Sequence, residues 1–132
     1  MTLEASVLRD DSLRRTAEGY AIDLHLAWYR SLPLSCVEDV QIELGGTPAA
    51  PEGLRFLVGG ESLRLTQLAD RVDDEWFVQD PLTVTVPDPT PRDPGEEIEL
   101  AVTMATRIPY ILIGPQQALV KPTRVRRRMV IQ

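Results

Sequence analysis

The chain has 132 residues, 43% of them hydrophobic and 26% charged, which indicates one globular domain spanning residues 1–132. Its net charge of −6 disfavours nucleic acid as a partner, and its apolar runs fall well short of the roughly 20 residues that cross a bilayer. The N-terminus is charged where a secretory signal would be apolar, and the single cysteine, Cys36, cannot form an internal disulfide, so a cytoplasmic protein is expected.

Strand signals begin near the N-terminus. Residues 3–9 are predicted to form a first strand and residues 10–12 a turn, while residues 14–18 show no clear preference. Residues 20–29 alternate apolar and polar side chains, as a half-buried strand does, and residues 40–44 repeat the pattern. Two such segments in succession predict an antiparallel sheet with one face on the core and one in solvent.

Two Gly-Gly pairs punctuate the middle of the chain. Gly45–Gly46 and Gly59–Gly60 tolerate the positive φ angles of tight hairpin turns. Residues 63–65 are therefore expected to return antiparallel to residues 54–58.

One short segment has helical spacing. Thr66 is expected to cap a helix over residues 67–72, in which Leu68 and Val72 lie four positions apart on one face. Residues 76–78 then form a brief aromatic strand.

The C-terminal third has the clearest strands. Residues 82–86 and 96–107 alternate regularly, and between them residues 87–95 hold four prolines and no apolar anchor, which predicts a stiff external loop. Residues 108–110 are expected to end the longer strand, and residues 123–131 to form the last one. Four side chains of the longer strand are predicted to point inward: Ile98, Leu100, Val102 and Met104.

Together these elements predict an all-β fold, an antiparallel β-sandwich of about seven to nine strands with one short helix. Residues 111–113 are apolar throughout and stop at Gly114–Pro115.

Charge is distributed unevenly along the chain. All 20 acidic residues lie at or before Glu99, and the basic residues that follow have no acidic neighbour in sequence. This basic block has two interpretations: it pairs with the acidic strands of its own sheet, or it steers an acidic partner.

No complete catalytic or metal-binding motif is present. His25 is the only histidine and falls on the polar face of its predicted strand, where a surface or interface position is expected. Ser35 has no identifiable base, and Cys36 has no paired cysteine. Residues 73–75 are acidic but lack the glycine-punctuated spacing of a calcium loop, so a solvated turn is expected. Catalytic and metal-ligating residues are therefore predicted to be absent from this chain.

What remains is a candidate contact surface. An aromatic-arginine cluster follows one strand and another ends a second strand, and the two converge at one end of the sandwich if those strands are neighbours; otherwise the aromatics are ordinary core or edge residues. Leu32 and Leu34 in the intervening connection are expected to add exposed apolar contacts. Seven residues are predicted to contact a partner or a substrate: Trp28, Tyr29, Arg30, Glu38, Asp39, Arg107 and Tyr110.

Several of these residues belong to longer patterns that resemble a known family. The chain contains WYRSLPLSCVEDVQIELGG, a Gly-Gly turn at residues 59–60, LTQLADRVDDEWFVQDPLTV, and RIPYI at residues 107–111. This combination, spanning Gly19 to Ile113, is similar to the small β subunit of bacterial C-glycoside deglycosidases.

The resemblance implies a specific partner and reaction. Family members act with a larger α subunit, a TIM-barrel protein that holds a divalent metal, usually manganese, and a histidine base. The substrate is a 3-oxo-C-glycoside, and its aglycone leaves by β-elimination after the C2 proton is removed. No cofactor is then expected on this chain. Its candidates for orienting an aglycone or an oxyanion are Tyr29, Arg30, Arg107 and Tyr110.

Two other roles stay open at this point. One is a stand-alone carbohydrate-binding or protein-interaction sandwich without catalysis. The other is an assembly subunit that contacts the partner and never approaches the substrate.

Overall fold

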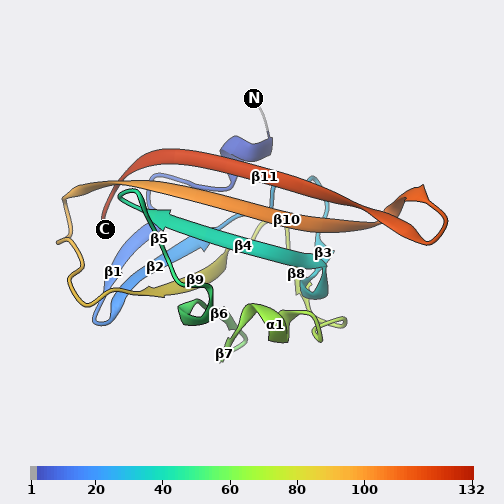
Figure 1. Ribbon diagram of the computed structural model, residues 1–132, viewed down its shortest axis with the longest axis horizontal. Coiled ribbons are helices and arrows are strands. Elements are labelled where there is room, and N and C mark those ends of the chain that lie inside the picture. The colour runs from blue at the N-terminus through green and yellow to red at the C-terminus, as the bar shows by residue number, and fades with distance from the viewer. Residues whose placement is uncertain (1–2) are drawn as a thin grey trace.

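Two antiparallel sheets face each other in the computed structural model, which describes residues 3–132 (Figure 1). The first sheet has five strands in the order β1 (Leu13–Thr16), β2 (Gly19–Leu24), β9 (Leu82–Pro87), β6 (Arg55–Val58) and β7 (Glu61–Leu63). The second has four, in the order β11 (Gln117–Val130), β10 (Glu97–Gly114), β4 (Val37–Leu44) and β5 (Thr47–Pro48). A separate two-stranded ribbon joins β3 (Leu32–Pro33) and β8 (Glu75–Trp76).

The predicted antiparallel β-sandwich is confirmed, with more strands than expected. Eleven strands occur in the described part of the chain. Two of them, β3 and β5, were not predicted because each spans only two residues, which is too short for a recognisable sequence pattern. Within residues 3–132, no helix has the length and apolar content needed to cross a membrane.

The core lies between the two large sheets and follows the predicted alternation. Ile98, Leu100, Val102 and Met104 of β10 are all buried, as are three residues of β9 on the facing sheet. Both Gly-Gly pairs adopt positive φ at hairpin turns, which confirms the β6–β7 pairing and adds the β4–β5 hairpin.

The predicted first strand is wrong. Leu3–Ser6 form a 3-10 helix, and Val7 and Leu8 enter the core without joining a ladder. The carbonyl of Val7 accepts the backbone N–H of His25 at 2.9 Å, a single bond in place of a strand pairing. The turn after it is confirmed, and β1 then occupies part of the segment that had no clear preference.

The strand predicted over residues 20–29 ends at Leu24, where its pairing with β9 also ends, at Leu82. The two segments expected in one sheet lie in different sheets, because β2 pairs with β9 and β4 pairs with β10. The connection between them therefore crosses from one layer of the sandwich to the other.

The helix is shorter than predicted. It is α1 (Leu65–Leu68), which begins earlier than the expected range, and the Gln67 side chain accepts the Arg64 N–H at 2.8 Å. Leu68 is buried as expected, but Val72 lies beyond the helix end and is 63% exposed.

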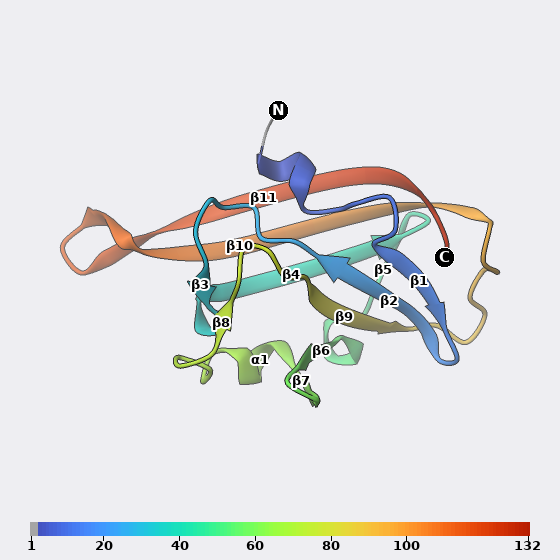
Figure 2. The same cartoon turned by 180° about the vertical axis from the view of Figure 1, so that it is seen from behind.

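The longest hairpin extends past its predicted limits. β10 continues through Pro109 to Gly114, and β11 begins at Gln117, six residues before the expected start at Thr123. The ladder shifts register between Ile108 and Leu112, and this irregularity accommodates a proline that cannot donate a hydrogen bond. As a result the hairpin projects beyond the rest of the sandwich in both views (Figures 1 and 2).

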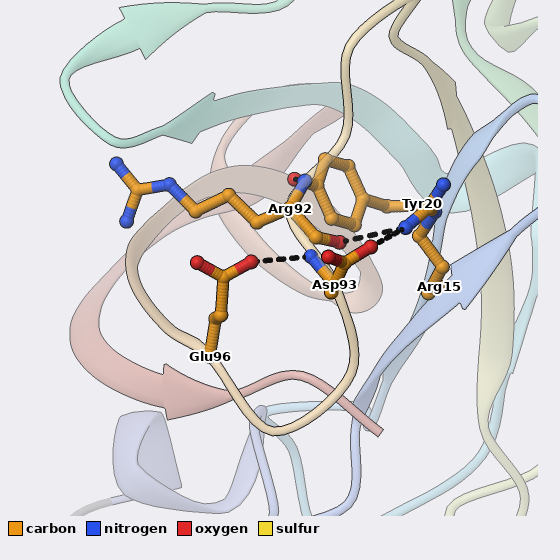
Figure 3. A network of polar contacts seen from close by, with 5 residues as sticks. All are labelled: Arg15, Tyr20, Arg92, Asp93 and Glu96. Carbon is orange, nitrogen blue, oxygen red and sulfur yellow. Dashed lines mark hydrogen bonds and ion pairs between the residues drawn. The ribbon is translucent and has the colours of Figure 1, made fainter.

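The proline-rich loop before β10 is held by polar contacts (Figure 3). The Tyr20 hydroxyl accepts the Arg92 backbone N–H at 2.7 Å, and Arg15 binds the Asp93 carboxylate at 2.7 Å and the Arg92 carbonyl at 3.3 Å. Glu96 accepts the Asp93 N–H at 2.6 Å. The loop is thus fixed to the five-stranded sheet by hydrogen bonds.

The basic block mostly pairs with acidic residues of its own chain. Arg126 contacts Glu99, and Arg128 binds Glu97 at 2.7 Å, across the β10–β11 ladder. Arg127 reaches Asp10. Such exposed pairs contribute little stability, about 0–1 kcal/mol each, and their main consequence is a neutralised outer face.

Candidate functional site

The structure brings the two aromatic-arginine clusters together at the end of the sandwich beside the long hairpin. The Trp28 indole N–H donates a hydrogen bond to the Tyr110 hydroxyl. The Arg30 guanidinium lies over the Tyr110 ring, with its carbon 4.9 Å from the ring centroid, a cation–π geometry. Trp28 and Tyr29 also contact each other, with ring centroids 4.9 Å apart and planes tilted by 42°. The two clusters do not come from neighbouring strands, because β2 and β10 lie in different sheets. They meet because the connection after β2 crosses from one sheet to the other and brings its aromatic residues to Tyr110.

Tyr29 and Tyr110 present two hydroxyl groups at this surface. Tyr29 is 61% exposed and Tyr110 is 45% exposed. A hydrogen bond with Tyr110 raises the pKa of Tyr29 above its ordinary value of 10.0, so the phenol is protonated at neutral pH and its hydroxyl is held beside that of Tyr110.

Arg107 fastens β10 to the start of β4. Its guanidinium binds the Glu38 carboxylate at 2.6 Å and the Ser35 carbonyl at 3.2 Å, and lies 3.9 Å from the Cys36 sulfur. Burial raises the pKa of the Cys36 thiol, and the charge of Arg107 offsets this only in part. Cys36 is therefore a protonated, buried thiol and a weak nucleophile.

Asp39 has other contacts than Glu38, the residue before it. It faces Ala105 across the β4–β10 ladder, and its carboxylate accepts a hydrogen bond from Gln41 at 2.9 Å. Within the described part of the chain, its carboxylate pairs with Gln41 and not with the aromatic residues of the cluster. Of the seven predicted residues, Trp28, Tyr29, Arg30 and Tyr110 form one contact group and Arg107 and Glu38 a second.

The expectation that Leu32 and Leu34 are exposed contacts is wrong. Both side chains are buried, because β3 pairs with β8 and the Leu34 N–H donates to the Asp74 carbonyl at 2.8 Å. The Ser31 hydroxyl also accepts a hydrogen bond from the Val78 N–H at 2.9 Å. The exposed residues of the connection are thus Tyr29 and Arg30, in its middle.

Sequence reasoning missed three exposed apolar residues on the projecting hairpin. Leu112 is 64% exposed, Ile113 is 60% exposed and Val120 is 44% exposed. The signal was present in residues 111–113, an unbroken apolar run that stops at a Gly-Pro turn and has no polar alternation to mark a half-buried strand.

His25 is buried, which corrects the expected surface position. Its exposed fraction is 7%, and its Nδ1 atom has no hydrogen-bond partner among the described residues. Burial, and then the charge of Arg9, lower the pKa of His25, so the ring is neutral at neutral pH.

The side chains present do not fit a metal ion. Among residues 3–132, no three or more histidine, cysteine, aspartate or glutamate side chains gather in a way that could hold a cation. Asp74 in the acidic turn instead pairs with Arg71 at 3.2 Å.

Comparison with known proteins gives one consistent result. A family model described as C-glycoside deglycosidase beta subunit matches residues 3–110. A C-glycoside deglycosidase beta subunit of Arthrobacter globiformis is 34% identical over 131 residues, which cover 99% of both chains. A 3'-dehydrocarminate deglycosidase beta subunit of Microbacterium sp is 36% identical over 108 residues, covering 82% of this chain and 80% of the relative. A C-glycoside deglycosidase beta subunit of Microbacterium trichothecenolyticum is 27% identical over 113 residues, covering 86% and 85%.

Proposed function

The chain belongs to the C-glycoside deglycosidase beta subunit family, and we propose that it acts as the small subunit of a heteromeric enzyme that cleaves the C–C glycosidic bond of 3-oxo-C-glycosides. The observation that carries this proposal is the 34% identity to a β subunit of that name across nearly the whole of both chains. The 3-oxo requirement has support from a second relative, whose name contains a substrate oxidised at the 3' position.

A C-glycoside needs a chemistry other than ordinary glycosidase acid catalysis, because no glycosidic oxygen is available to protonate. A ketone at C3 acidifies the proton at C2, so a base can remove it. The electron pair then forms the C1–C2 double bond while the bond from C1 to the aglycone breaks, and the aglycone carbon takes up a proton.

We place the base and the divalent metal, expected to be manganese, on the larger TIM-barrel subunit. Support for this division comes from the side chains of this chain, since His25 is buried and no metal-binding cluster occurs among residues 3–132. When bound, such a metal would stabilise the enolate as a Lewis acid.

The contribution of this chain is to complete the wall of the substrate site. Tyr29 and Arg30 are exposed and carry a phenol and a guanidinium, which suit an aromatic aglycone and its departing negative charge. Tyr110 holds both in place through its ring and hydroxyl. Arg107 is engaged with Glu38 and Ser35, so we assign it a positioning role.

The test is an activity assay on a 3-oxo-C-glucoside with added manganese. The large subunit encoded nearest to this chain would be assayed alone, this chain alone, and the two together. We expect turnover only with both chains present. Equal turnover by the large subunit alone, or no turnover by the mixture, would contradict the proposal. If this chain does not bind the large subunit, a stand-alone binding sandwich would be favoured.

Alanine substitutions separate a role at the substrate from a role in assembly alone. For Tyr29→Ala and Arg30→Ala we expect kcat to fall about tenfold or more in a complex that stays intact by gel filtration. Arg64→Ala, which removes an exposed arginine before α1, is the matched control and should leave turnover unchanged. Dissociation of the Tyr29 and Arg30 variants would instead assign these residues to assembly.

A further inference from the structure

The β10–β11 hairpin forms an arm that the sandwich does not cover. The arm comprises residues 109–122, and it extends past β3, β8 and the rest of the fold in both views (Figures 1 and 2). Its two strands remain paired beyond the register shift, at Leu112 with Ala118 and at Gly114 with Gln117. The arm is therefore an ordered hairpin and presents a defined surface.

This arm concentrates exposed apolar side chains. Four of the nine large exposed hydrophobic residues of the described chain lie on it, and a fifth, Tyr29, contacts its base. The four on the arm are Tyr110, Leu112, Ile113 and Val120. Isolated exposed apolar residues are ordinary, but a concentration of them on one projecting element is typical of an interaction surface.

The one charged residue within the arm, Lys121, is positive. No acidic residue follows Glu99 in the sequence. Within the described residues, Arg30, Lys121 and Arg124 have no carboxylate at ion-pair distance, in contrast to the paired arginines further along β11. A surface that complements the arm is therefore apolar at its centre and acidic at its rim.

We propose that this arm is the element by which the chain docks onto its large subunit, on an apolar surface of that subunit bordered by carboxylates. This inference rests on the proposed function, which supplies the partner. The arm is continuous with the substrate-facing cluster through Tyr110, so docking the arm places Tyr29 and Arg30 at the seam between the subunits. Assembly and completion of the substrate site are then one event.

A second copy of this chain fits the arm less well. If two arms met across a two-fold axis, unpaired cations would face each other with no acidic residue on either arm. A contact from the arm to the outer face of the four-stranded sheet of another copy would meet carboxylates, such as those of Glu97 and Glu99, that already pair with arginines of their own chain. The large subunit is the occupant that the charges favour.

The test measures binding of the purified large subunit to the full chain by isothermal titration. The arm variants are Leu112→Asp, Ile113→Asp and Val120→Asp. Two controls match them in exposure: Val72→Asp at a position 63% exposed, and Val130→Asp at a position 44% exposed. All five changes are at exposed sites, and unchanged circular dichroism and thermal midpoints would verify folding.

We expect each arm variant to raise the Kd about tenfold or more, and the Kd of the two controls to stay within about twofold of that of the parent chain. Lys121→Glu should also slow association and reduce its dependence on salt. Arm variants that bind as tightly as the parent would overturn the docking role while leaving the proposed function intact. A parent chain that fails to bind the large subunit at all would overturn both, and a parent dimer that the arm substitutions dissociate would replace the large subunit with a second copy.

Discussion

Tyr110 is the residue on which the aromatic end of the molecule depends. It accepts the Trp28 N–H, lies under Arg30 and hydrogen-bonds with Tyr29, so side chains from the crossing connection meet at one ring on β10. The aromatic and arginine composition of the two segments predicted such a cluster. The specific contacts were not predictable, because the crossing between sheets decides which segment faces Tyr110.

Replacing Tyr110 with phenylalanine tests this contact directly. The hydrogen bond with Tyr110 raises the pKa of Tyr29, so in Tyr110→Phe the Tyr29 pKa should fall toward its ordinary value of 10.0. Ring-labelled NMR titration of Tyr29 would measure the change. Tyr110→Leu should lower the pKa as well and also lose the contact with Arg30, whereas an unchanged pKa in both would contradict the arrangement.

Arg107 is expected to stabilise the junction of β10 and β4. In Arg107→Ala the Ser35 carbonyl, in a buried residue, loses a donor, which costs about 1 kcal/mol of the free energy of unfolding. The Cys36 thiol pKa should rise further, because the charge that lowers it is removed. Urea denaturation and thiol alkylation rates would measure both effects. Arg124→Ala is the control, an exposed arginine of β11 without an ion pair in the described chain, and an equal loss there would refute the assignment.

His25 predicts a pH dependence of stability with a definite sign. Burial and the charge of Arg9 lower its pKa in the folded protein below the ordinary value of 6.5, against smaller opposing contributions from a hydrogen bond with the Val7 backbone and from the charges of Asp23 and Asp11. As pH falls below 6.5, His25 binds a proton in the unfolded chain before it does so in the folded protein. The free energy of unfolding therefore decreases as pH falls from 6.5 to the folded pKa of His25, and this loss remains at lower pH. Unfolding of the parent and of His25→Gln would be compared at neutral pH and at about pH 5.5. The parent should lose more stability than the variant, and equal losses would contradict the assignment.

At the scale of elements, regular alternation was predictable and strand ends were not. The inward side chains of β10 followed from a period of two over a long segment. Its end was misplaced because Pro109 normally interrupts a ladder, and here a register shift absorbs it. The end of β2 was misplaced for the opposite reason, since its pattern continues past Leu24 although its partner strand does not.

The proline-rich loop gives a prediction at this scale. Tyr20 is 1% exposed and its hydroxyl accepts the Arg92 N–H, so Tyr20→Phe should destabilise the fold by about 1 kcal/mol. Amide hydrogen exchange in residues 91–96 should accelerate, because the loop loses one of its anchors. Tyr29→Phe removes an exposed hydroxyl and is the control. Unchanged exchange in the loop of Tyr20→Phe would show that the other contacts suffice.

At the scale of the whole molecule, the outer face of the four-stranded sheet and the β10–β11 arm differ in how their exposed side chains are paired. The outer face of the four-stranded sheet is largely neutralised by pairs such as Arg128 with Glu97. The opposite situation holds at the arm, where Leu112, Ile113 and Val120 lie exposed and Lys121 forms no ion pair within the described chain. The family resemblance already predicted a partner, but the docking element lies partly beyond residues 3–110, the part that the family model matches.

The central claim is that this chain is one subunit of a hetero-complex, joined to its partner through the aromatic and apolar end. Light scattering after gel filtration of an equimolar mixture with the large subunit tests it most directly. The account predicts one species containing both chains, with a mass above that of either chain alone. Two separate species, each with the mass it has in isolation, would contradict it.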